Sequence, residues 1–148
     1  MTVEQQTVMS GGEIDTLLER QETGVLALAR GDEPYAIPIS YGYDPNSRAF
    51  CMRLVQTPDG EKEEFLTGSP SVRFVVYEEA ETTYRSVVAV GTLERLPKSE
   101  LTPEHVERYG AAKRPLFEMW GESKHDLDID LYELAPDELS GRRVEIDR

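Results

Sequence analysis

Lys62 lies where a helix ordinarily disfavours a cation, in the short stretch Gly60–Gly68. The Asp-Gly pair at 59–60 predicts a turn, the residues after it favour a helix, and Gly68 suits the left-handed position that ends one. Lys62 would then occupy the first turn, where free backbone N–H groups and the helix dipole favour an anion. Two interpretations follow: Lys62 pairs with a nearby carboxylate such as Glu61, or it helps to bind a phosphate.

More groups that can bind a phosphate lie on either side of this predicted helix. Arg53 belongs to the strand before it, and Arg85 and Ser86 belong to the start of a strand after it. A guanidinium can hold a phosphate with two N–H donors, and a serine hydroxyl can add a third. We expect one hairpin to bring these side chains together. The equal alternative is that each cation pairs with a surface carboxylate.

The usual sets of catalytic and metal-binding residues are missing from the sequence. It has no GxGxxG motif, no Walker lysine and no Gly-x-Ser-x-Gly elbow. His105 and His125 stand apart from any cysteine or carboxylate pair, so we expect surface histidines and no metal site. Asp126, Asp128 and Asp130 alternate with apolar residues, which predicts a strand with carboxylates facing water instead of a calcium loop. No side chain is assigned as catalytic.

The composition is that of an acidic globular protein. Among 148 residues, 39% are hydrophobic, and 29 acidic against 16 basic side chains give a formal net charge of -13. Such a surface repels nucleic acid, and it suits a protein that stays soluble in concentrated salt. No apolar run is long enough to cross a membrane and no secretory signal is visible, so we expect a cytoplasmic protein. Cys51 is the only cysteine, and its apolar strand predicts a core residue.

The elements that must position these residues are mostly strands. We expect a single domain over residues 1–148, with residues 1–9 loose and a helical insertion over 97–125. Ser10 and Glu13 form a capping box, which predicts a helix over Gly11–Arg20 that covers a sheet. Strands are predicted over Gly24–Arg30, Pro34–Tyr43, Arg48–Val55, Val72–Tyr77, Tyr84–Leu96 and from Asp126 to Leu131, with a last short one over Arg142–Ile146.

These elements predict a mainly β fold of the α+β class, an antiparallel barrel with peripheral helices. Short turns between successive strands favour antiparallel pairing. Gly91 lies in the longest strand and marks a bulge or a sharp bend, which is how a sheet closes into a barrel.

Several segments together resemble the flavin-binding split-barrel family related to pyridoxamine 5′-phosphate oxidase. The resemblance covers about residues 10–96. From Asp126 to Asp147 the chain is similar to the family only in its pattern of residues. The segments that carry it are Thr23–Leu28, Pro34–Tyr43, Gly60–Lys62, Pro70–Phe74 and Tyr84–Gly91.

The resemblance implies a split barrel that binds FMN at the interface of a homodimer and acts as an oxidoreductase on a small molecule. Lys62 would hold the FMN phosphate with help from Arg53, Arg85 or Ser86. Trp120 would cover the pocket from the partner chain, or would be an ordinary core residue. The residues implied to line the flavin ring are Ile37, Pro38, Ile39 and Ser40.

Two departures from the family pattern limit which reactions the protein is expected to catalyse. Ser140–Val144 does not reproduce the arginine-bearing motif with which the oxidase binds pyridoxal phosphate, which argues against that activity. Arg53 stands where members similar to nitroimidazole reductases carry a histidine. The alternatives are a barrel that binds a deazaflavin or haem, and a flavin-binding dimer without turnover.

Overall fold

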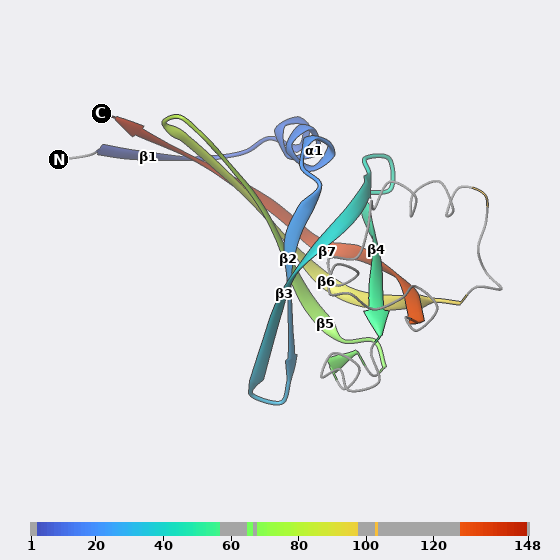
Figure 1. The fold of residues 1–148 in the computed structure, drawn as a ribbon. Coiled ribbons are helices and arrows are strands. Elements are labelled where there is room, and N and C mark those ends of the chain that lie inside the picture. Colours follow the sequence, from blue (N-terminus) through green and yellow to red (C-terminus); the bar gives the residue numbers. More distant parts are fainter. Residues whose placement is uncertain (1–2, 57–64, 67, 98–102, 104–127, 148) are drawn as a thin grey trace, which may run out of the picture.

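Seven antiparallel strands and one helix make up the described part of the chain (Figure 1). The computed structural model describes residues 3–56, 65–66, 68–97, 103 and 128–147. The elements are β1 Val3–Val8, α1 Gly11–Arg20, β2 Thr23–Arg30, β3 Glu33–Asp44, β4 Ala49–Gln56, β5 Ser71–Ala80, β6 Thr83–Leu96 and β7 Asp128–Asp147. In the sheet the strands follow the order β1-β7-β4-β3-β2-β5-β6, and β7 also pairs with β6. This second pairing closes the sheet, so the predicted antiparallel split barrel is confirmed.

Alternating residues of the strands fill the barrel. Phe50 and Leu54 on β4, Phe74 on β5 and Leu134 on β7 are fully buried. Phe50 and Phe74 meet edge to face, with ring centroids 5.3 Å apart. Burying such side chains contributes about 1.5–3 kcal/mol each, and the other face of each strand remains available for contacts outside the barrel.

Helix α1 begins and ends as its sequence predicts. The Ser10 hydroxyl accepts a hydrogen bond from the Glu13 amide at 3.2 Å, and Ile14, Leu17 and Leu18 are buried beneath the helix. The hydroxyl of Tyr41, on β3, donates to the carbonyl oxygen of Leu18. The Tyr41 hydrogen bond thereby fixes α1 to the sheet at the C-terminal end of its apolar stripe.

Two expectations about the ends of the chain were wrong. Residues 1–9 were expected to be loose, but Val3–Val8 forms β1 and pairs with β7 from Val3–Asp147 to Val8–Arg142. Two short closing strands were expected, but β7 is continuous over 20 residues. It passes Pro136 because the β6–β7 register shifts between Val90 and Gly91, which confirms the irregularity predicted at Gly91.

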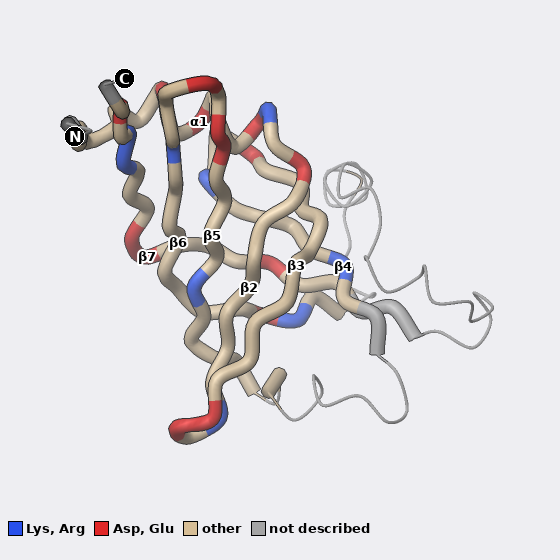
Figure 2. Tube along the Cα trace, turned by 60° about the vertical axis from the view of Figure 1, so that its left-hand side comes forward, with Lys and Arg blue, Asp and Glu red and all other residues tan. Residues whose placement is uncertain are grey.

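An arm extends from the barrel where β1, the second half of β7 and the β5–β6 turn run together, with α1 beside them (Figure 1). Along β2 and β3 the tube in Figure 2 is almost free of charge, and charged residues gather at the hairpin that joins these strands. Among the described residues, no helix is long and apolar enough to cross a membrane.

Candidate functional site

Ser40 and Arg53 are neighbouring polar residues on β3 and β4. Each stands next to a member of the Tyr41–Met52 pair, where the β3–β4 register ends, and alternates with buried core residues, so both lie on the face that points away from the barrel core. The Ser40 Oγ atom and the Arg53 Nε atom are buried, and neither has a hydrogen-bond partner among the described residues. A buried polar atom without a partner costs about 1–3 kcal/mol, which makes this pair a candidate site for a polar ligand.

The four residues expected to line a flavin ring are divided between the two faces of β3. Ile37 and Ile39 are 6% and 0% exposed and belong to the barrel core. Pro38 and Ser40 alternate with them and lie on the outer face. Because strand side chains alternate with a period of two, four consecutive residues cannot present their side chains to one ligand. Only Pro38 and Ser40 offer side chains on the face of Arg53.

An open groove of about 700 Å³ lies beside Ser40 on the same outer face. Ser40 pairs with Thr23, and Pro38 pairs with Val25, so the groove continues from β3 onto β2 and then to β5. Among the residues that the structure describes, no lysine or arginine lines it. The side chains that line it include those of Gln21, Thr23, Val25, Pro38, Tyr77 and Glu79.

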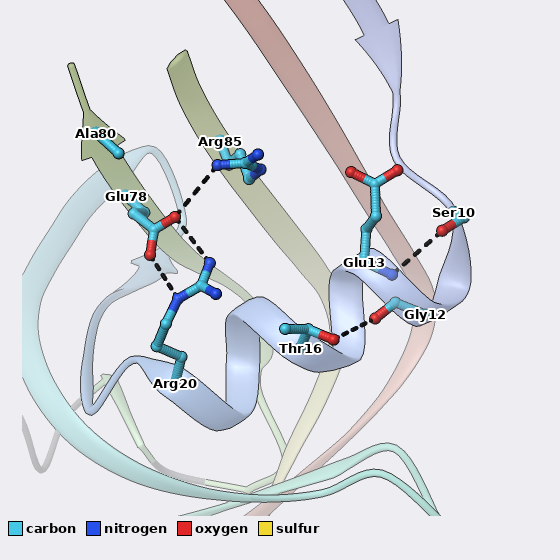
Figure 3. Close-up of a pocket in the computed structure, with 8 residues that line it drawn as sticks. All are labelled: Ser10, Gly12, Glu13, Thr16, Arg20, Glu78, Ala80 and Arg85. Carbon is cyan, nitrogen blue, oxygen red and sulfur yellow. Dashed lines mark hydrogen bonds and ion pairs between the residues drawn. The ribbon is translucent and has the colours of Figure 1, made fainter. Parts of the chain in front are cut away.

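A second pocket, of about 720 Å³, lies between α1 and the β5–β6 hairpin and contains Arg85 (Figure 3). Its centre is Glu78, which accepts hydrogen bonds from Arg20 at 2.7 and 2.8 Å and from Arg85 at 3.4 Å. The carboxylate of Glu78 is therefore shared by two arginines, and Arg85 makes the longer contact. This is the carboxylate pairing that the sequence left open for Arg85.

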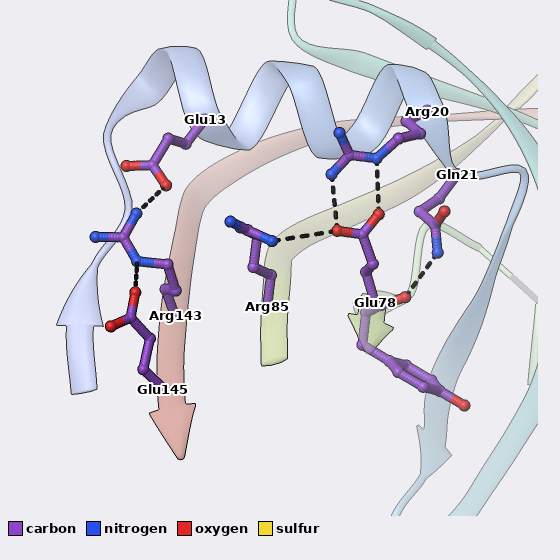
Figure 4. A network of polar contacts seen from close by, with 8 residues as sticks. Glu13, Arg20, Gln21, Glu78, Arg85, Arg143 and Glu145 are labelled. Atoms are coloured by element: carbon purple, nitrogen blue, oxygen red, sulfur yellow. Dashed lines mark hydrogen bonds and ion pairs between the residues drawn. The ribbon is translucent and has the colours of Figure 1, made fainter. Parts of the chain in front are cut away.

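A separate group of charge pairs lies near the end of β7 (Figure 4). Arg143 is the register partner of Arg85 and donates to Glu13 of α1 at 2.6 Å. Glu145 lies 3.7 Å from the Nε atom of Arg143. Arginine and glutamate side chains alternate within each of the two groups, and each group joins α1 to a strand of the arm through charge pairs.

The expectation that Arg53 and Arg85 come together within one chain was wrong. Arg53 pairs with Leu131 on β7, whereas Arg85 pairs with Arg143, twelve residues further along the same strand. Ser86 alternates with Arg85 and lies on the other face of β6, where it pairs with Tyr77. Sequence proximity to the predicted helix suggested a common site, but the register of the strands separates the two arginines.

Lys62 and Trp120 lie outside the described residues. Near Lys62, Phe65 is buried and stacks on Tyr35 with ring centroids 5.0 Å apart. Gly68 has a φ of 75°, which confirms its predicted left-handed conformation. In the aspartate series that resembles a calcium loop, Asp128 and Asp130 belong to strand β7. No cluster of metal-binding side chains is found among the described residues.

Sequence reasoning missed the groove residues Thr23, Val25, Tyr77 and Glu79. The only sequence feature that could have pointed to them is the alternation of side chains along each strand. Val25 precedes the buried Leu26, and Tyr77 follows the buried Val76, so Val25 and Tyr77 lie on the outer face. Tyr77 is 58% exposed, which is unusual for a large aromatic side chain on a strand.

The closed antiparallel sheet with a single covering helix defines the class of the protein, a split β-barrel of the kind found in flavin-binding proteins. The family model for pyridoxamine 5′-phosphate oxidase matches residues 10–143. The chain belongs to this family.

Solved structures share the fold at low sequence identity. The chain is similar to a FAD-binding protein from Mesorhizobium loti, with a TM-score of 0.72, 22% identity, and coverage of 97% of this chain and 99% of that one. It is also similar to a FAD-binding protein from Mycobacterium smegmatis, with a TM-score of 0.68, 17% identity and coverage of 94% and 98%. A FAD- and haem-binding protein from the same organism has a TM-score of 0.64 at 18% identity, with coverage of 97% of this chain and 73% of that one.

A relative in sequence is an uncharacterized protein of Rhizobium meliloti (strain 1021). The two are 30% identical over 94 residues, which is 63% of this chain and 59% of the relative. The match therefore spans less than two thirds of the relative's length.

Proposed function

We propose that the protein binds FMN on the outer face of its barrel, as a homodimer, and uses it as an oxidoreductase acting on a small molecule. The observation that carries this proposal is the buried pair of Ser40 Oγ and Arg53 Nε, neither of which has a hydrogen-bond partner in the part of the chain that the structure describes. A flavin edge or phosphate can accept a hydrogen bond from both groups, so the residues present fit the cofactor. Relatives of the same fold that bind FAD add support.

Each residue would have a limited role in this site. Arg53 would donate to the cofactor and carry a fixed positive charge, and Ser40 would orient the same group through its hydroxyl. Pro38 would present an apolar wall beside them. Lys62 would hold the phosphate. A bound flavin supplies the transfer of hydride or electrons, so the protein needs to bind, orient and exclude water, and it needs no catalytic triad.

The outer face also supports the proposed homodimer. Pro38, Val25, Val75 and Val88 form one row across four strands, because each is the register partner of the next. A sheet with apolar residues on both faces normally has both faces covered. A second copy over this row would bury it and would close the groove beside Ser40.

The visible absorption spectrum of the purified protein tests the cofactor. We expect flavin bands after purification or after addition of FMN, with FMN bound more tightly than FAD, a deazaflavin or haem. A protein that shows no flavin bands and binds neither FMN nor FAD would overturn the proposal. Reduction by a nicotinamide donor followed by reoxidation would support turnover, whereas a bound flavin that never cycles would indicate a binding protein.

The matched variants Arg53→Gln and Arg48→Gln test the site. Both remove a cation at β4 or the turn before it, but Arg48 is exposed and pairs with Asp15 at 3.4 Å. Losing a charged hydrogen-bond donor costs about 1.5–3 kcal/mol, so Arg53→Gln should weaken FMN binding roughly 10-fold or more. Equal FMN affinity in both variants would contradict the role of Arg53.

Light scattering tests the proposed homodimer and should give twice the mass of the chain.

A further inference from the structure

We infer that the pocket between α1 and the β5–β6 hairpin binds a small, doubly charged oxyanion of the phosphate type, held by Arg85 and Arg143. The pocket measures about 720 Å³, and Arg85 and Arg20 line it together with residues from the first turns of α1. Arg143 adjoins Arg85 as its register partner on β7. A phosphate ion fills only part of this volume, so the pocket also has room for the organic part of a phosphate monoester.

This pocket is separate from the proposed flavin site. Arg85 lies on the face of β6 that also carries the buried Val87, and its side chain points toward α1 (Figure 4). Ser86 alternates with Arg85 and lies on the other face, away from the barrel core, as Ser40 and Arg53 do on their strands. The inference therefore goes beyond the proposed function and does not depend on it.

Arg85 and Arg143 place two positive charges opposite each other. As register partners on adjacent strands, they have Cβ atoms about 5 Å apart on one face of the sheet, where like charges destabilise the pairing. Glu78 pairs with Arg85 and Glu13 pairs with Arg143, but no described carboxylate contacts both arginines. An anion between the two guanidinium groups would offset their repulsion.

Both guanidinium groups keep N–H donors for a ligand. The contact of Arg85 with Glu78 is long, at 3.4 Å, because Arg20 holds the same carboxylate at 2.7 and 2.8 Å. Arg143 donates from Nη1 to Glu13 at 2.6 Å, but its Nε atom is buried and makes no hydrogen bond with a described residue. A guanidinium carries five N–H groups in a fork that matches the oxygens of a phosphate. The two arginines therefore offer more donors than the described acceptors use.

The first turn of α1 adds a second wall that favours an anion. Ser10 and Gly12 line the pocket (Figure 3). The Ser10 hydroxyl accepts from the Glu13 amide, which leaves its own O–H free to donate. The first amide groups of a helix have no partner within it, and the helix dipole favours negative charge there. Gly12 has no side chain that would block the approach of a ligand to this backbone.

Isothermal titration calorimetry on the full chain tests the inference with inorganic phosphate, phenyl phosphate and acetate, at constant ionic strength and about pH 8, where the phosphates are doubly charged. We expect a phosphate to bind roughly 10-fold or more tightly than acetate, because a dianion can accept from both guanidinium groups at once. Tighter binding of phenyl phosphate would identify the ligand as a phosphate ester, and tighter binding of inorganic phosphate would identify it as the free ion. Binding of neither phosphate, or equal binding of acetate, would overturn the inference.

Matched arginine variants locate the anion. Arg85→Gln should weaken phosphate binding roughly 10-fold or more, and Arg85→Lys, which keeps the charge but loses the fork, should lie between Arg85→Gln and the unmodified protein. Arg30→Gln is the control, since Arg30 is exposed, pairs with Glu33 at 3.4 Å and lies at the β2–β3 hairpin far from α1 (Figure 1). Full phosphate affinity in Arg85→Gln, or equal losses in Arg85→Gln and Arg30→Gln, would overturn the inference.

A variant with the opposite expected sign tests Arg143. Glu13→Gln removes the carboxylate that competes with the ligand for Arg143, so it should tighten phosphate binding roughly 2- to 5-fold. A loss of fold does not produce a gain in affinity, and circular dichroism checks that each variant is folded. Unchanged or weaker binding by folded Glu13→Gln would contradict the placement of the anion beside Arg143.

Discussion

The hydroxyl of Tyr41 donates a hydrogen bond to the carbonyl oxygen of Leu18 over 2.8 Å, and this contact joins the barrel wall to the last turn of α1. The final carbonyl groups of a helix have no N–H partner within it, and the amide of Gln21 already donates to Leu17 instead. Tyr41 therefore completes the end of α1 from inside the barrel core, where it is 3% exposed.

Tyr41→Phe should lower the free energy of unfolding by about 1–3 kcal/mol, because it leaves a buried carbonyl group without a partner. Urea unfolding monitored by circular dichroism measures the change. Tyr84→Phe is the control, since the Tyr84 side chain is half-buried and makes no hydrogen bond with a described residue; it should stay within about 0.5 kcal/mol of the unmodified protein. Equal effects would show that the hydroxyl of Tyr41 contributes nothing specific.

The stability of the protein should fall in alkali through the same residue. Burial is the main cause that raises the pKa of Tyr41 above its ordinary value, and burial with the hydrogen bond to Asp15 raises the pKa of Tyr43. The stabilisation from Tyr41 is fully present below the unfolded pKa of about 10. Above it the unfolded chain loses a proton that the folded one keeps, so stability falls by at most about 1.4 kcal/mol per pH unit for Tyr41.

Urea unfolding at several pH values between pH 8.5 and 11 checks this dependence. The unmodified protein should lose stability more steeply above pH 10 than Tyr41→Phe, which cannot ionise at that position. Parallel curves for the two proteins would contradict the raised pKa of Tyr41.

A single methyl group should have opposite effects at two glycines. A Cβ atom at Gly24 would lie 2.5 Å from Phe74 and 2.8 Å from the carbonyl oxygen of Val75, so Gly24→Ala should destabilise by about 1–3 kcal/mol or more. At Gly12, in the first turn of α1, the nearest atom lies 4.0 Å away, and alanine should stabilise by up to about 1 kcal/mol. Thermal unfolding of both variants checks the signs, and destabilisation by Gly12→Ala would contradict the open space seen there.

Ser40→Ala should raise the stability of the ligand-free chain and weaken the binding of FMN. Removing a buried hydroxyl that lacks a partner among the described residues relieves a cost of about 1–3 kcal/mol, part of which the smaller side chain loses again in packing. Loss of one hydrogen bond to FMN should reduce its affinity roughly 5- to 10-fold. Unfolding of the ligand-free protein and FMN titration measure the two changes, and a loss of stability without a loss of affinity would make Ser40 a purely structural residue.

Local signals predicted the elements that local chemistry controls. The capping box at Ser10 and Glu13 placed α1, and Gly91 marked the register shift of the longest hairpin. Gly68 adopts its expected positive φ because only glycine does so without strain. The short turns and the long bent strand predicted an antiparallel barrel, and the family resemblance predicted its split-barrel type, which the pairing confirms.

Pairing between distant strands could not be predicted in the same way. Val3–Val8 has no apolar alternation, and its order comes from hydrogen bonds to β7. Pro136 and Gly141 lie between the two short strands that were predicted, but the bulge accommodates Pro136, and Gly141 leaves room for Met9 and Ile14 beneath α1. The distance between Arg53 and Arg85 depends on which residue of β7 each of them pairs with. The residues next to either arginine in the sequence do not reveal that pairing.

Strand β7 contacts β4, β6 and β1, and it is the single element through which the sheet closes. While the chain is being synthesised, the edges of β4 and β6 that pair with β7 stay unpaired until residues 128–147 have left the ribosome. Exposed edges of this kind invite pairing with other chains, and contacts between strands so far apart in sequence form slowly. Late closure would make the nascent chain a client of chaperones, and a ribosome stalled before residue 128 would present an open sheet prone to aggregation.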